Sequence, residues 1–425
     1  MSEVLKMNVA GGGYPSIRYF HEINVYCMQI AFFDDQFRED LFPFLMTRPA
    51  ATLRCGVLTV EEKWIRRCSF QGSVRYITAN YLSTIFARPD STDCLLINGS
   101  ALPDDALVAA VMKLGSNQQI VHGDRLVALR CEASRLLQRE FLMPEDQFES
   151  VQFDSDVRLL RHPWDLFQMN DGQIRSDFSL VSGNETSQPL PEGNTLIGNG
   201  GLFIGPGARI QASVINTETG PVYIAAGAEV MEGTLIRGPF ALGEQAVLKM
   251  GARIYGATTI GPGCKVGGEV SNSILLANSN KAHDGFLGNS VVGEWCNLGA
   301  DTNNSNLKNN YSSIRVWNHR TNSSLDTGLQ FCGLFMGDHS KCSINTMFNT
   351  GTVVDVFANV FGAGFPAKHI PSFSWGSEEG GHFMLDKALD AASRVMARRG
   401  RELSAAEREM LEHLYMSSLH PRAED

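Results

Sequence analysis

The chain has 425 residues, of which 43% are hydrophobic and 19% charged, and its net charge is −10. This composition is that of a folded soluble protein with room for two or three domains, and the acidic balance argues against a nucleic-acid partner. The sequence has no apolar run of the roughly 18 residues that span a bilayer, and its nine scattered cysteines form no CxxC pair. We therefore expect reduced, buried thiols in a cytoplasmic protein that has no membrane partner.

Residues 1–27 differ in character from the rest of the chain. They contain the breaker cluster Gly11-Gly12-Gly13-Tyr14-Pro15 and lack the cationic and apolar regions of a signal peptide. We expect Met28 to be the biological start, and residues 1–27 to be a non-native or disordered extension.

An α/β domain is predicted over residues 28–180. Period-two apolar runs predict strands at 29–33, 73–78 and 94–97. Amphipathic patterns predict helices at 60–67, 104–114 and 144–153, and Trp164 lies near the start of a connecting helix. The polar, breaker-rich residues 182–189 form the linker to the next domain.

A six-residue period dominates the second half of the chain. Counting by sixes gives an unbroken aliphatic series: Ile224, Val230, Ile236, Leu242, Leu248, Ile254, Ile260 and Val266. A short strand and a tight turn occupy six residues, and three such units close a triangular coil with the aliphatic side chains inside. We therefore predict a left-handed parallel β-helix of hexapeptide repeats over residues 190–365. The repeat alone assigns no function, because such prisms also serve as inert oligomerisation posts.

The tail, residues 366–425, is predicted to be helical. Amphipathic helices are expected at 385–398 and 404–419, and Ser404 with Glu407 forms a capping box for the second one. We expect both helices to pack against the prism, and the proline-marked segment 369–376 to cross onto a neighbouring chain.

The aliphatic ladder is interrupted after Val270 and again after Leu298, and polar loops fill both breaks. Irregular loops on a regular solenoid are where binding residues concentrate. The motifs there are His283-x-x-Phe286-Leu287-Gly288, Asn297-Leu298-Gly299-Ala300-x-Thr302 and Asn306. In residues and spacing they resemble the acetyltransferase half of the bifunctional N-acetylglucosamine-1-phosphate uridyltransferase / glucosamine-1-phosphate N-acetyltransferase family.

The resemblance implies a role for each motif residue. His283 would be the general base that takes a proton from the glucosamine amine as it attacks acetyl-CoA, a role that suits imidazole near neutral pH. Asn297 and Asn306 would bind the sugar phosphate. Three residues would contact acetyl-CoA: Ala300, Asp338 and Ala363.

Cations for the phosphate are less well defined. Lys281 and Lys308 lie close to the motif in sequence, although solvated loop lysines explain them equally well. Arg253 is nearest in spacing to the family's phosphate-binding arginine, and Lys249 competes with it. The family's tyrosines are replaced by Phe286 and Leu307 and one of its lysines by Ser271, so the acceptor sugar stays open.

The N-terminal segments Phe33-Asp34-Asp35, Thr47-Arg48-Pro49-Ala50 and Ile97-Asn98-Gly99 resemble the shortened nucleotidyltransferase-like domain in a Bacteroidetes-type version of the same enzyme. That resemblance implies UTP as a second substrate. The standard family has a glycine-rich loop, a lysine after a proline and an aspartate after a glycine. This chain lacks the loop, and it has Ala50 and Ser100 at the two other positions. Arg48, Arg54 and Lys63 are candidate replacements for its cations, and Asp34 or Asp35 for its Mg²⁺ ligand. A degenerate domain in which these residues pair structurally is the alternative.

The family's acetyl-CoA groove lies between adjacent prisms, so the resemblance implies a homotrimer. Two other functions stay open. One is a γ-carbonic-anhydrase-type enzyme with zinc on His283, His319 and His339. The other is a non-catalytic scaffold that binds nucleotide sugars.

Overall fold

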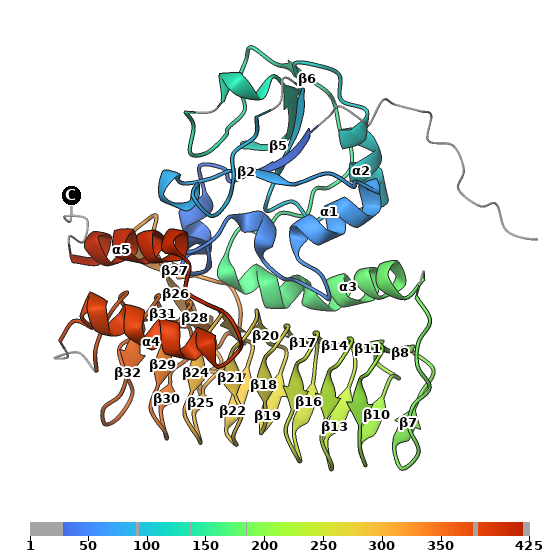
Figure 1. Cartoon of the computed structure of the whole chain (residues 1–425), viewed down its shortest axis with the longest axis vertical. Helices are drawn as coiled ribbons and strands as arrows, with labels where there is room; N and C mark the ends of the chain where they lie inside the picture. The colour runs from blue at the N-terminus through green and yellow to red at the C-terminus, as the bar shows by residue number, and fades with distance from the viewer. Residues whose placement is uncertain (1–28, 91–92, 137, 184, 377–380, 420–425) are drawn as a thin grey trace, which may run out of the picture.

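The computed structural model describes residues 29–90, 93–136, 138–183, 185–376 and 381–419. The expected extension, residues 1–27, lies outside the described residues. The chain forms an N-terminal α/β domain, a parallel β-solenoid of the left-handed β-helix type with about ten turns in the described part, and C-terminal helices (Figure 1). The fold class predicted from the sequence is thus confirmed.

The N-terminal domain is built on a mixed sheet with strand order β2-β1-β3-β5-β4-β6. Its strands are β1 (Gln29–Phe33), β2 (Arg75–Ile77), β3 (Cys94–Asn98), β4 (Gln118–His122), β5 (Arg125–Cys131) and β6 (Glu149–Ser150). Its helices are α1 (Val60–Cys68) and α2 (Asp105–Met112), with 3-10 turns at Arg38–Leu41, Phe44–Met46, Ala50–Thr52, Asn80–Leu82 and Ala133–Arg135. Thr59 and Glu62 form a capping box that starts α1.

The predicted strands at 29–33, 73–78 and 94–97 and the helices at 60–67 and 104–114 are confirmed within a few residues. The helix predicted at 144–153 is wrong. Its backbone pairs with β4 instead: the Glu149 N–H donates to the Asn117 carbonyl at 3.0 Å and the Val151 N–H to the Gln119 carbonyl at 2.8 Å. Tertiary strand pairing therefore overrides the local helical pattern.

The connecting helix α3 (Pro163–Ser182) lies along the solenoid beneath the N-terminal domain (Figure 1). The buried Asn170 donates to the Ala257 carbonyl at 2.9 Å, and Phe167 stacks with Phe335 at 6.3 Å. The same helix also carries Asp177, which binds the N-terminal domain. Helix α3 thus joins the two domains through side chains on both of its faces.

The solenoid has three sides of parallel strands, which we name the first, second and third sides. The first side holds β7 (Thr195–Ile197), β10 (Val214–Asn216), β13 (Leu235–Arg237), β16 (Arg253–Tyr255), β19 (Glu269–Ser271) and β22 (Phe286–Gly288). The second side, under α3, holds β8 (Leu202–Ile204), β11 (Val222–Ile224), β14 (Phe240–Leu242), β17 (Thr258–Ile260), β20 (Ile274–Leu275), β23 (Val291–Val292), β28 (Leu334–Met336), β31 (Thr352–Val354) and β33 (His369–Ile370).

The third side holds β9 (Arg209–Ile210), β12 (Glu229–Val230), β15 (Val247–Leu248), β18 (Lys265–Val266), β21 (Asn280–Lys281), β24 (Asn297–Leu298), β29 (Lys341–Cys342) and β32 (Asn359–Val360). Strands β25 (Asn303–Asn304) and β30 (Met347–Phe348) pair with each other, and β22 contacts β25. The long break in the ladder contains an antiparallel hairpin, β26 (Arg315–Asn318) and β27 (Ser323–Asp326).

The hexapeptide ladder forms the core of the solenoid. Ile224 pairs with Leu242 and Leu242 with Ile260, so one coil takes three hexads. All the aliphatic residues counted from the sequence are buried. Each such side chain contributes about 1.5–3 kcal/mol by leaving water, so the ladder is the main source of stability in the prism.

The C-terminal helices α4 (Leu385–Ala397) and α5 (Ala405–Leu419) cover one corner of the prism (Figure 1). At that corner Trp295, His339, Phe357 and Phe373 have φ values of 60°, 61°, 59° and 59°. Bulky side chains rarely adopt this left-handed conformation, and here they form a ring stack that packs under Leu389, Leu411 and Tyr415. The predicted packing of the tail on the prism is confirmed. Its Ser404–Glu407 capping box also forms.

The segment expected to cross onto a neighbouring chain instead pairs with its own chain. Val353 and Val354 of β31 are in register with His369 and Ile370 of β33. In the described part of the chain the cysteines are unpaired, and all of them except Cys68 are buried, as predicted; Cys27 lies outside it. None of the helices described here combines the length and the apolar character needed to cross a membrane.

Candidate active site

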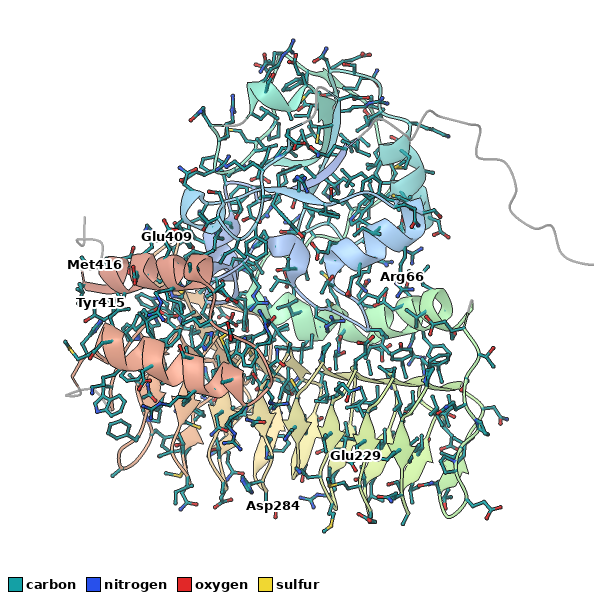
Figure 2. All side chains as sticks on the ribbon, viewed as in Figure 1. Arg66, Glu229, Asp284, Glu409, Tyr415 and Met416 are labelled. Carbon is teal, nitrogen blue, oxygen red and sulfur yellow. The ribbon has the colours of Figure 1, made fainter. Side chains whose placement is uncertain are left out.

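His283 lies in the turn after β21, at the corner between the third and first sides. Its side chain is exposed, and its ring has no hydrogen-bond partner among the described residues. Figure 2 shows its neighbour Asp284 at the edge of the prism that faces away from the N-terminal domain. An imidazole without a structural partner is free to accept a proton from a bound ligand.

The backbone around His283 is held in place by the next coil. The Asp301 N–H donates to the Asp284 carbonyl at 3.1 Å, and the Phe286 N–H donates to the Asn303 side chain at 2.8 Å. Gly285 has a φ of 116°, and a Cβ there would lie 2.2 Å from the Thr302 carbonyl oxygen, so only glycine fits. This stacking places Ala300 in the adjacent coil at the same corner as His283.

Asn297 is exposed on the third side, and its Oδ1 accepts a hydrogen bond from Asn280 at 3.4 Å. The Asn280 Oδ1 accepts in turn from Arg399 Nη2 at 3.0 Å, while Arg399 Nη1 donates to the Gly263 carbonyl at 2.6 Å. The positive charge of Arg399 lowers the pKa of the nearby Lys265. This polar row can therefore receive an anionic group beside Asn297.

Arg399 was not among the residues singled out from the sequence. It lies just beyond the C-cap of α4 and reaches the third side from a position 119 residues away from Asn280 in the chain. The pair Arg398-Arg399 at the end of a predicted helix could have indicated a binding site. Basic residues are common at this position, however, because they interact favourably with the negative end of the helix dipole.

Asn306 is half-buried at the far end of the first side from His283, and its Nδ2 donates to Asn289 Oδ1 at 2.8 Å. It shares space with Phe286 over Gly288, where a Cβ would lie 2.7 Å from the Asn306 amide and 2.4 Å from the Phe286 ring. Within the described chain no hydrogen bond joins His283 to Asn297 or Asn306. In one prism His283 and Asn306 therefore lie at opposite ends of the first side, and Asn297 lies on the third side.

The lysines and the arginine expected near a phosphate have different environments. Lys281 lies inside the prism with 2% of its surface exposed, and Nζ donates to the carbonyls of Gly267 at 3.0 Å and His283 at 2.6 Å. Burial lowers its pKa to about 8. Lys308 is half-buried and donates to Ser312 at 3.4 Å, and Arg253 is exposed on the first side, 3.8 Å from Glu269. Lys281 thus orients the His283 backbone from inside the coil.

Asp338 is buried between the two domains. Its Oδ2 accepts hydrogen bonds from Thr47 at 2.7 Å and from Arg48, and its Oδ1 accepts from the Glu294 N–H at 2.7 Å. Arg48 also pairs with the Glu294 carboxylate. Ala363, by contrast, lies in an exposed loop after β32. Because β21, β24, β29 and β32 are successive neighbours on the third side, the turn with Ala363 lies at the same corner as His283, three coils further along. The structure does not bring Asp338 to that corner.

The acidic residues of the N-terminal domain lie at the carboxyl ends of the parallel strands β1 and β3. Asp34 accepts from the Ala50 N–H at 2.8 Å, Thr78 at 2.5 Å and Arg38 at 3.2 Å. Burial raises the pKa of Asp34, and Arg38 opposes that rise. Asp35 accepts from Phe37 N–H at 2.9 Å, Arg125 at 2.8 Å and Asn98 at 3.1 Å. Both carboxylates are thus occupied by donors from the chain itself.

The remaining cations of this domain are Lys63 and Arg54. Lys63 is buried and paired with Asp177 of α3, and burial lowers its pKa. Arg54 is half-buried, 3.5 Å from Glu62, and lines a cavity of about 170 Å³ together with Arg66, Tyr223, Gly243 and Pro262. Figure 2 places Arg66 on the side of the N-terminal domain that faces α3 and the prism. A second interdomain cavity, of about 280 Å³, is lined by Arg48 together with Glu294 and Asp338. Two of the predicted nucleotidyltransferase cations, Arg54 and Arg48, therefore border cavities between the domains.

The three histidines considered for a zinc enzyme do not form one site within a chain. His319 pairs with Asp355, and His339 is buried in the aromatic stack, where burial lowers its pKa. His283 is exposed at its own corner.

Residues 30–186 match a family model described as sugar nucleotidyl transferase. The N-terminal domain is sugar nucleotidyl transferase-like. The match covers less than half of the chain and ends at α3, before the prism. No curated protein matches the sequence.

Two solved structures are similar to parts of the chain. The polySia-specific acetyltransferase NeuO is 7% identical, with a TM-score of 0.21, over 45% of this chain and 86% of its own. An Arabidopsis UDP-N-acetylglucosamine acyltransferase is 15% identical, with a TM-score of 0.17, over 54% of this chain and 88% of its own. At these TM-scores neither structure bears on the activity of the prism, which has to be argued from its residues.

Proposed function

We propose that the prism is an N-acetyltransferase that moves the acetyl group of acetyl-CoA to an amino-sugar phosphate, with glucosamine-1-phosphate as the acceptor. The observation that carries the proposal is the unpartnered His283 imidazole, exposed at a prism corner one coil from Ala300. A general base needs this freedom, because a ring committed to a structural hydrogen bond cannot take a proton from substrate.

The proposed reaction uses His283 as base. The acceptor amine attacks the thioester carbonyl carbon, a C–N bond forms, and His283 takes the proton that the nitrogen loses. The C–S bond then breaks, and the CoA thiolate leaves and regains a proton from His283. Asn297 and Arg399 border a polar row that suits the acceptor phosphate.

We include a homotrimer in the proposal. His283 and Asn306 occupy different corners of one prism, so a neighbouring copy could bring the two corners together. The first side also exposes large apolar side chains, among them Leu196, Leu235 and Tyr255, with 46%, 49% and 39% of their surfaces exposed. Exposed large apolar side chains of this kind favour association. The unpaired thiols in the described chain agree with a cytoplasmic setting.

The acceptor is tested by measuring CoA thiol release with glucosamine-1-phosphate and, in parallel, with glucose-1-phosphate. The two sugars differ in the amine that the proposed mechanism acetylates. We expect release with the amino sugar alone, and an acetylated product by mass spectrometry. Equal release with both, or none from folded protein, would contradict the proposal.

Sugar-1-phosphate nucleotidyl transfer with UTP is a second candidate, favoured by the match over residues 30–186. Asp34 and Asp35 do not fit a Mg²⁺ ion as they stand, since donors of the chain occupy their oxygens. Pyrophosphate release from UTP and N-acetylglucosamine-1-phosphate would support this activity. Tight binding of UDP-N-acetylglucosamine without turnover would favour the scaffold alternative.

A further inference from the structure

His319, Asp355 and His369 gather where the hairpin β26–β27 meets the last coils of the prism. The His319 Nε2 lies 2.9 and 3.1 Å from the two carboxylate oxygens of Asp355, and the His369 Nε2 lies 2.9 Å from one of them. One ligand atom from each residue lies within 4.8 Å of the others. Both imidazoles thus point the same nitrogen at one carboxylate.

The three side chains are held in position from several directions. The Asp355 N–H donates to the Ile370 carbonyl at 2.9 Å, which fixes the carboxylate relative to β33. The His369 ring stacks on Trp317 with centroids 4.6 Å apart. The two imidazole planes are nearly perpendicular, at 89°, so their nitrogens approach the carboxylate from different sides.

The cluster is built around the buried carboxylate of Asp355. The Asp355 side chain is 5% exposed, and its hydrogen-bond partners in the described chain are the two imidazoles, with no lysine or arginine among them. A buried carboxylate needs a nearby cation to offset its lost hydration. The imidazole nitrogens face this carboxylate from two sides, so a divalent ion bound to all three groups would supply the positive charge.

The ligand atoms of the cluster indicate which cation it would bind. Two imidazole nitrogens and one carboxylate oxygen suit zinc and its neighbours among the divalent transition metals, whereas Mg²⁺ and Ca²⁺ prefer oxygen ligands alone. Three protein ligands leave a fourth tetrahedral position open. The His319 and His369 side chains are 14% and 22% exposed, so that position can be reached from solvent.

We propose that His319, Asp355 and His369 bind one divalent ion of the zinc class, with the fourth position taken by water or by an oxygen of a small ligand. The site lies within one chain, uses a carboxylate, and is separate from the proposed acetyl-transfer corner. His319 Nδ1 is buried without a partner in the described chain. Since an incomplete second shell weakens metal binding about 10–100-fold, we expect weaker binding than at a fully supported site.

The ion would also join three parts of the fold. Asn318 and Arg320, on either side of His319, each donate to Asp40 of the N-terminal domain at 2.8 Å. The Phe42 ring contacts the edge of the His319 ring at 5.6 Å. Metal binding would therefore stabilise the hairpin between the N-terminal domain and the end of the prism, and raise the Tm of the whole chain.

The test uses the full chain, freed of metal by a chelator and titrated with Zn²⁺ by calorimetry, with Co²⁺ absorption as a second reading of the ligand set. We expect one ion per chain and a higher Tm with Zn²⁺. His369→Ala and Asp355→Asn should lose this binding. His122→Ala is the matched control, since His122 lies 3.7 Å from Asp156 in an exposed pair that lacks a third ligand, and it should bind as the wild type does.

Circular dichroism shows which variants keep the fold. If His369→Ala or Asp355→Asn does not fold, His319→Gln is used in its place, because it preserves side-chain bulk. Absence of saturable Zn²⁺ binding by the wild type would overturn the proposal. So would equal binding by wild type and the ligand variants, or binding of Mn²⁺ in preference to Zn²⁺. None of these readings depends on acetyl transfer.

Discussion

Arg48 makes one of the charged contacts between the N-terminal domain and the prism. Its guanidinium lies between the carboxylates of Glu294 and Asp338, and its side chain is 10% exposed. The pair Arg48–Asp338 spans 290 residues of sequence. Both residues were singled out for ligand binding because their types suit it, and no sequence pattern could show that they face each other.

Arg48→Ala is expected to destabilise the protein by about 3–5 kcal/mol, because it leaves the buried carboxylate of Asp338 beside the half-buried one of Glu294 without a cation. Urea unfolding measures the change. Arg54→Ala is the control: its ion pair with the half-exposed Glu62 should be worth about 1 kcal/mol or less. An Arg48→Ala variant with unchanged stability and lost nucleotide binding would instead restore the catalytic role predicted from the sequence.

Lys281 gives the prism a pH dependence. Its pKa falls from the ordinary 10.5 to about 8 on burial, so between these values the unfolded chain binds more protons than the native one. The free energy of unfolding contributed by this group therefore rises with pH across that window and is constant below it. Relative to Lys281→Met, the wild type should gain stability from pH 8 to 10 in urea titrations. A constant difference would contradict the buried position of Lys281.

At the scale of elements, periodic sequence patterns predicted those helices and strands whose formation depends on nearby residues in the chain. Helices α1 and α5 begin with capping boxes, which can be read directly from the sequence. The segment around β6 could not be read, because its strand pairing with β4 is a tertiary contact. For the same reason the position of Arg399 over Asn280 could not be predicted, although the helix that precedes it was.

Arg399→Ala should raise the KM for the acceptor sugar phosphate while changing kcat little, because the side chain orients Asn280 and Asn297 and does not contact the reacting atoms. Arg394→Ala is the control: that residue is on α4, just before Arg399, its side chain is 78% exposed, and its partner is Asp390. Steady-state kinetics with both variants tests the polar row. Equal KM values for the two would remove Arg399 from the acceptor site.

At the scale of the whole molecule, the N-terminal domain and α3 cover the second side and leave the first side open (Figure 1). The hexapeptide period predicted the prism, because a buried aliphatic residue at every sixth position is a local pattern that the sequence repeats many times. How the domains dock was not predicted, because it rests on single pairs such as Lys63–Asp177 and Arg48–Asp338. His283 lies on the far edge, so the two proposed activities would act on opposite sides of the chain.

The uncovered first side predicts self-association. We expect light scattering on purified protein to give three times the chain mass of 46.6 kDa. Leu235→Glu, which places a charge in the exposed apolar surface of this side, should lower that mass. A monomer in the wild type would leave the corners of His283 and Asn306 apart and would contradict the proposed composite site.

The most direct test of the proposed function is CoA thiol release from acetyl-CoA with glucosamine-1-phosphate, compared between the wild type, His283→Ala and the control His122→Ala. If His283 is the general base, its replacement should lower kcat by about 10²–10⁴-fold with the fold and trimer mass unchanged, because that is the usual contribution of a positioned base. His122→Ala should match the wild type. Wild-type turnover in His283→Ala would contradict the central role given to this histidine.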